Sequence, residues 1–97
     1  MEQLTFTYAA QASVARRVHI GVVGSGDLEV LLEPSVDGQA HVTVTTSVSG
    51  YAAVWKNVLD RFFTRFSGAA AIEINDFGAT PGVVMLRLEQ AAEAARA

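Results

Sequence analysis

The sequence contains no cysteine, which excludes both a disulfide framework and thiolate catalysis. Basic residues are also scarce: seven lysines and arginines stand against ten acidic residues, and the net charge is −3. They form no dense run, so we expect no nucleic-acid partner held through its phosphates. No apolar stretch approaches the ~18 residues of a membrane-spanning helix, and residues 1–4 lack the charged and apolar regions of a signal peptide. The expectation is a cytoplasmic protein with no membrane partner.

The chain has enough apolar material for one domain with a single core, since 51% of its 97 residues are hydrophobic. Alternation of apolar and polar residues predicts four strands in the first half. They are residues 4–8, 18–23, 28–32 and 40–47, with residues 9–15 as a loop. Apolar and aromatic residues at steps of three and four then predict one amphipathic helix over residues 51–66. Ser49 is its expected N-cap and Gly68 its expected C-terminal stop.

The last third predicts two more strands and a short tail helix. The strands are expected at residues 71–75 and 83–88, the second with Val84, Leu86 and Leu88 on one side, and the alanine-rich tail is expected to be helical over residues 90–96. The fold class is therefore α+β: a largely antiparallel sheet covered on one face by one main amphipathic helix, with a short C-terminal helix.

The most informative motif is Gly24-Ser25-Gly26-Asp27, which lies between the predicted strands at residues 18–23 and 28–32. The segment is short enough for a β-hairpin turn, where glycine supplies the positive φ that such turns require. Ser25 then presents a small hydroxyl with no bulky neighbour, and a large reagent can reach it. Serine and glycine are also ordinary turn formers, so the motif alone leaves a purely structural role open.

The surroundings of Ser25 do not resemble a hydrolase. A nucleophilic serine needs a base, and the only histidines are His19, on the preceding strand, and His41. A strand-to-helix nucleophile elbow is missing because strand follows the motif. The glycines near Ser25 are not followed by the helix that a dinucleotide-binding site requires, and the segment has no P-loop lysine. No set of His, Asp and Glu residues has the spacing of metal ligands. Asp27 is expected to cap the turn through backbone amides, and the alternative is that it faces a partner enzyme.

A second unusual stretch, residues 75–82 (NDFGATPG), is rich in residues that restrict the backbone. Two interpretations remain open: a rigid loop, or a docking surface close to the hairpin tip.

Residues 22–34 (VVGSGDLEVLLEP) resemble the N-terminal part of the delta subunits of malonate decarboxylases, which are acyl carrier proteins. Residues 75–83 (NDFGATPGV) and 86–90 (LRLEQ) resemble the C-terminal part of that family, and residues 46–48 also fit. The likeness spans nearly the whole chain and is weakest at residues 9–17, at residues 35–39 and inside the predicted helix. It implies a single acyl carrier domain over residues 1–97.

The resemblance also implies a function and a site. It makes Ser25 the attachment point of 2'-(5''-phosphoribosyl)-3'-dephospho-CoA, bound covalently through a phosphodiester and carrying acetyl or malonyl as a thioester. The implied partners are the acyltransferase (alpha) subunit, the decarboxylase (beta and gamma) subunits, a malonyl transferase and a prosthetic-group transferase. The chain itself is then a carrier and not an enzyme.

Two alternatives stay open. The carrier subunit of citrate lyase uses the same kind of group on a serine. A non-modified interaction module, with the hairpin and residues 75–82 as its docking face, needs no attachment at all.

Overall fold

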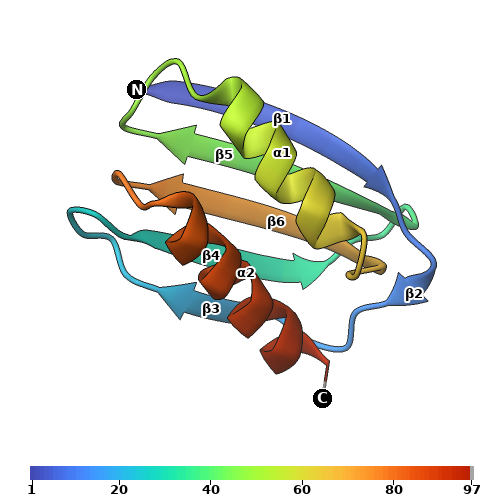
Figure 1. Ribbon diagram of the computed structural model, residues 1–97. Coiled ribbons are helices and arrows are strands. Elements are labelled where there is room, and N and C mark those ends of the chain that lie inside the picture. The colour runs from blue at the N-terminus through green and yellow to red at the C-terminus, as the bar shows by residue number, and fades with distance from the viewer. Residues whose placement is uncertain (97) are drawn as a thin grey trace.

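The computed structural model of the protein describes residues 1–96 as one six-stranded sheet with two helices on one of its faces (Figure 1). The elements in chain order are β1 (Glu2–Ala9), β2 (Ala12–Ser13), β3 (Val18–Gly21), β4 (Leu28–Pro34), β5 (Gln39–Thr46), α1 (Ala52–Phe63), β6 (Gly68–Asp76) and α2 (Pro81–Ala95). Within residues 1–96, no helix is both long and apolar enough to cross a membrane.

The sheet is mixed but largely antiparallel. Its strand order is β1-β5-β6-β4-β3, with the two-residue β2 paired to β6. The pairs β1–β5, β3–β4 and β4–β6 are antiparallel, whereas β5–β6 and β2–β6 are parallel. Parallel neighbours need a crossover, and α1 provides it between β5 and β6. The predicted fold class is therefore confirmed, and strand order, which the sequence left open, is now defined.

Alternate residues of the central strands face the helices and form the core. Leu28, Val30 and Leu32 of β4 are fully buried, as are the inward residues of β5 and β6. The predicted inward positions Ile72 and Ile74 are among them. The aromatic stripe of α1 packs onto this surface through Trp55, Val58, Leu59 and Phe62.

Helix α1 is shorter at both ends than predicted. Its N-cap is Tyr51, not Ser49, and no side chain caps it. It ends at Phe63, and Gly68 is not a helix stop but the first residue of β6. A Cβ atom at Gly68 would lie 2.5 Å from the Phe66 ring, so packing of that ring, and not a left-handed helix end, requires glycine there.

The predicted strand at residues 83–88 is wrong, because these residues belong to α2. Thr80 caps the helix by accepting a hydrogen bond from the Val83 amide at 3.3 Å, and Pro81 occupies the first turn. Val84 and Leu88 are buried at a helical step of four, whereas Leu86 is half-exposed. The predicted tail helix at residues 90–96 is the second half of the same helix.

Two smaller expectations also change. The predicted loop at residues 9–15 contains β2. Strand β3 ends at Gly21, so Val22 and Val23 lie outside the sheet and are exposed. A Cβ at Gly21 would lie 2.3 Å from the Leu28 carbonyl oxygen, which shows how closely the two chains approach at the base of the hairpin.

The β3–β4 turn, the β6–α2 loop and the β5–α1 loop all lie at one end of the sheet, on the left of Figure 1. This end brings together the two sequence stretches singled out above, residues 24–27 and 75–82.

Candidate functional site

Ser25 occupies the second position of a tight turn. The Asp27 amide donates to the Gly24 carbonyl at 3.1 Å, which closes a four-residue β-turn with Ser25 and Gly26 at its centre. Gly26 has φ of +74°, the sign that the third position of a type II turn requires. Ser25 is exposed, and its hydroxyl makes no hydrogen bond to any of residues 1–96. The predicted accessibility of this hydroxyl is confirmed.

The turn is held against the β6–α2 loop by its backbone. The Gly26 amide donates to the Phe77 carbonyl at 2.8 Å, and the Phe77 amide donates to the Asp27 carbonyl at 2.9 Å. These two bonds join Phe77 to two successive residues of the turn and continue the β4–β6 ladder beyond its last pair, Leu28 and Asp76. Residues 75–82 therefore lie beside the hairpin tip as a backbone support for it, and they lead into a helix instead of a strand.

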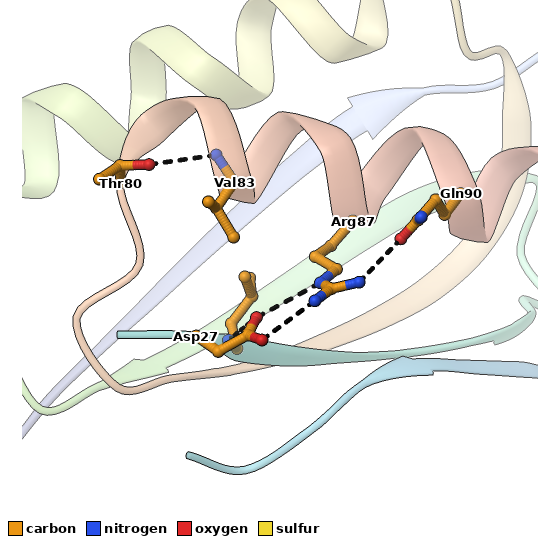
Figure 2. A network of polar contacts seen from close by, with 6 residues as sticks. Asp27, Thr80, Val83, Arg87 and Gln90 are labelled. Atoms are coloured by element: carbon orange, nitrogen blue, oxygen red, sulfur yellow. Dashed lines mark hydrogen bonds and ion pairs between the residues drawn. The ribbon is translucent and has the colours of Figure 1, made fainter. Parts of the chain in front are cut away.

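Asp27 connects the turn to α2. Its Oδ1 accepts from the Leu28 amide at 2.7 Å, which confirms the expected bond to a backbone amide. Arg87 donates to both carboxylate oxygens, from Nη2 to Oδ2 at 3.0 Å and from Nε to Oδ1 at 3.3 Å (Figure 2). A third guanidinium nitrogen, Nη1, donates to the Gln90 side chain at 3.2 Å. A two-point ion pair fixes direction as well as distance, so the flank of the turn is anchored to a rigid helix.

The Arg87 guanidinium also changes the acidity of Asp27. Its hydrogen bonds, followed by the bond from the Leu28 amide, hold the pKa of the Asp27 carboxyl below its ordinary value. The carboxylate is therefore charged throughout the neutral range.

The buried carboxylate of Asp76 stabilises the β6–α2 loop. Asp76 is only 4% exposed, and its Oδ2 accepts from the Thr46 hydroxyl at 2.8 Å and from the Gly78 amide at 3.3 Å. Its Oδ1 accepts from the Ala79 amide at 3.0 Å. Three donor atoms, one at the end of β5 and two in the β6–α2 loop, thus converge on one side chain, which explains how a glycine-containing loop keeps a single shape.

The two histidines are paired elsewhere. His19 Nε2 lies 2.9 Å from Glu29 Oε2, and Glu29 Oε1 in turn accepts from Asn75 at 2.8 Å. His41 Nε2 lies 2.6 Å from Asp37, in the turn at the far end of the sheet. Neither histidine hydrogen-bonds to Ser25, so residues 1–96 contain no serine–histidine pair. The same residues contain no group of three or more His, Asp and Glu side chains able to hold a metal ion.

The turn geometry predicts different costs for its two glycines. Gly26→Ala is expected to lower the unfolding free energy by about 1–2 kcal/mol, because alanine resists the left-handed backbone. Gly24→Ala is the matched control: Gly24 has no positive φ, and the nearest atom to an added Cβ is 4.0 Å away. Urea unfolding of both variants measures the change in unfolding free energy. Equal effects for the two glycines would contradict the turn geometry.

The Asp27–Arg87 pair predicts a pH-dependent contribution to stability. The pKa of Asp27 is lower in the folded chain than its ordinary value of 3.8, so the pair contributes fully above that value. The contribution is lost as the pH falls through the lowered pKa. The difference in unfolding midpoint between the wild type and Arg87→Gln is therefore expected to shrink on acidification below about pH 4.

The control for that experiment is Arg96→Gln, at the C-cap of the same helix, where the ion pair with Glu93 is largely exposed. Such pairs contribute little to stability. A difference between the wild type and Arg87→Gln that does not change with pH would show that the ion pair is not what Arg87 contributes.

Comparison with known proteins identifies one family and several relatives that match nearly the whole chain. The family model described as malonate decarboxylase delta subunit (MdcD) matches residues 15–95. A malonate decarboxylase acyl carrier protein from Pseudomonas paraeruginosa is 54% identical over 96 residues, which cover 98% of this chain and 97% of the relative. The protein of the same name from Azotobacter vinelandii is 50% identical over 94 residues and covers 96% and 95% of the two chains.

A solved structure agrees with this relationship. One chain of a crystal structure of a Pseudomonas malonate decarboxylase hetero-tetramer in complex with malonate superposes with a TM-score of 0.92 at 49% identity, over 97% of this chain and 98% of that one. The family match covers most of the chain, and these relatives match it over nearly their whole length. The chain therefore belongs to the malonate decarboxylase delta-subunit family, whose relatives named above are acyl carrier proteins.

Proposed function

We propose that this chain is the acyl carrier subunit of a malonate decarboxylase and that Ser25 is its attachment residue for 2'-(5''-phosphoribosyl)-3'-dephospho-CoA. One observation supports this site above all others. Ser25 is an exposed, unbonded hydroxyl on a turn whose backbone is held by Phe77 and whose flank is held by Arg87. A carrier needs such an arrangement, because its attachment atom must be reachable while its base stays rigid.

The residues around Ser25 fit a large covalent group. An added Cβ at Gly26 would meet nothing within 4 Å, and one at Gly24 would meet only the tip of Val22 at 4.0 Å. The glycines on both sides of Ser25 therefore leave open space beside the serine. A bulky substituent on the oxygen needs no rearrangement of the turn.

Ser25 acts as the nucleophile in its own modification. Its oxygen forms a bond to the innermost phosphorus of a triphosphoribosyl precursor, and the bond from that phosphorus to pyrophosphate breaks. The hydroxyl proton must pass to a base. Because neither histidine contacts Ser25, the prosthetic-group transferase is the partner that supplies this base.

When bound, the group would supply a thiol that carries acetyl or malonyl as a thioester, and the thioester carbonyl would stabilise negative charge as carbon dioxide leaves. The chain contributes position only. The Asp27–Arg87 pair and the Phe77 bonds limit motion of the anchor, so the attached arm moves while its base does not.

The carrier must meet several proteins in turn. The proposed partners are the prosthetic-group transferase, the malonyl transferase, the alpha acyltransferase subunit and the beta and gamma decarboxylase subunits. The hetero-tetramer that contains the related chain supports a multi-subunit assembly.

The test is to express the chain together with the modifying enzymes and to measure its intact mass. We expect one adduct with the mass of the phosphoribosyl-dephospho-CoA group, which then accepts malonyl from the malonyl transferase. An adduct that exchanges acyl groups with citrate instead would indicate a citrate lyase carrier. Absence of any adduct, with partner binding retained, would indicate a non-modified interaction module.

A further inference from the structure

A cavity of about 310 Å³ opens at the same end of the sheet as the Ser25 turn, between the first turns of the two helices. Its walls include Tyr51, Val54 and Trp55 on the α1 side and Pro81 and Val84 on the α2 side. Trp55 is almost fully buried, whereas Tyr51 is half-exposed and Val54 is 40% exposed. The cavity therefore has an apolar interior with an aromatic ring at its mouth.

The two buried polar side chains in the cavity already have partners. Thr46 and Asp76 line its base, and they hydrogen-bond to each other at 2.8 Å. Asp76 also accepts the amides of Gly78 and Ala79. A ligand in this cavity therefore meets mainly hydrocarbon and aromatic surface, which suits a flat, uncharged ring and not a phosphate or carboxylate.

The cavity lies next to the attachment residue. Gly78 is on its rim, and an added Cβ at Gly78 would lie 4.0 Å from the backbone nitrogen of Gly26. Phe77, the residue before Gly78, forms the two backbone bonds to the Ser25 turn. The rim residue Gly78 thus directly follows the residue that hydrogen-bonds to Gly26.

The following step rests on the proposed function, because the connectivity of the prosthetic group determines which part of it lies close to Ser25. The phosphate on Ser25 joins a ribose, and that ribose joins the 2' position of the adenosine in dephospho-CoA. Adenine is thus the aromatic ring nearest to the anchor. The arm that ends in the thiol leaves from the other side of the adenosine and extends away.

We propose that the cavity between the two helices binds the adenine base of the prosthetic group. Its volume is at the small end of the roughly 300–1,000 Å³ typical of ligand pockets, which suits one nucleoside better than a larger ligand. Tyr51 offers a half-exposed aromatic ring for packing against the base, and the base would cover the exposed side chains of Val48 and Val54. Binding the base there gives the arm a second anchor and sets the direction in which the thiol extends.

The test is an NMR comparison of the apo chain with the fully modified chain, whose adduct is first verified by intact mass. Trp55 is the only tryptophan, so a single indole resonance reports on the cavity. We expect that resonance to shift on modification, and we expect nuclear Overhauser contacts from the adenine ring protons to Tyr51 and to the Val54 methyl groups. A shift confined to residues 24–27 would overturn the inference.

A variant that fills the cavity provides a second readout. Val54→Arg places a long side chain at its mouth, and the partial exposure of Val54 lets the variant fold. Its control is Val36→Arg, at a fully exposed valine beyond the far end of the sheet. We expect the adduct on both variants but the adenine contacts only on Val36→Arg.

The outcomes separate the inference from the proposed function. An adduct on the wild type without contacts from adenine to the cavity would leave Ser25 as the attachment residue and overturn the inference. Adenine contacts that persist unchanged in Val54→Arg would overturn it as well. Absence of the adduct from the wild type would remove the proposed function and the inference together.

Discussion

Ser25→Ala is expected to gain no adduct under conditions in which the wild type is fully modified. The methyl group that replaces the hydroxymethyl has no oxygen to form the phosphodiester, so the loss is complete and not partial. Any malonate decarboxylase activity that depends on the carrier is expected to disappear with it. Intact-mass measurement of both chains after coexpression with the modifying enzymes provides the readout.

The matched control is Ser49→Ala, since Ser49 is another exposed serine in a loop at the same end of the sheet. It is expected to be modified as fully as the wild type. Ser25→Ala should also keep its stability within about 0.5 kcal/mol, as surface substitutions generally do. A Ser25→Ala chain that still carries the adduct would exclude Ser25 as the attachment residue.

Leu88→Ala is expected to lower the unfolding free energy by about 2–5 kcal/mol, because Leu88 is fully buried where α2 packs on the sheet. A loss of that size is a large part of the roughly 5–15 kcal/mol that stabilises a typical domain. Leu86→Ala, two residues earlier, is expected to cost much less because Leu86 is 50% exposed. Urea unfolding at neutral pH compares the two variants directly.

This pair of variants distinguishes a helix from a strand at residues 83–88. In a strand, residues 86 and 88 would face the same side and would be buried alike. In α2 they are 200° apart around the helix axis, since each residue turns the chain by about 100°. Equal losses for Leu86→Ala and Leu88→Ala would contradict α2 over this segment.

Most of the fold is predictable from local patterns. The strands at residues 28–32 and 40–47 alternate because one face of each is buried, and the helix stripe at Trp55, Val58, Leu59 and Phe62 is buried as its period indicates. Residues 83–88 are misread because Val84 and Leu88 satisfy a step of two as well as a step of four. The informative signal was Thr80 followed by Pro81, a helix N-terminus that resembles a turn when read alone.

The candidate site also has one feature that local sequence predicts and others that it does not. Exposure of Ser25 follows from its immediate neighbours, so the sequence predicts it. The support of the turn by Arg87 does not follow from neighbouring residues. Arg87 lies 60 residues from Asp27 and reaches it only if α2 is a helix above β4. The Asp76–Thr46 bond likewise depends on the parallel pairing of β5 with β6, which no local pattern indicates.

The most direct test of the account is to locate the modification in the protein isolated with its natural modifying enzymes. Fragmentation of the intact modified chain in a mass spectrometer assigns the added mass to one residue. We predict that every fragment containing Ser25 carries the full phosphoribosyl-dephospho-CoA mass and that every fragment lacking Ser25 is unmodified. The same mass on any other residue, or a fully unmodified chain within an active complex, would contradict it.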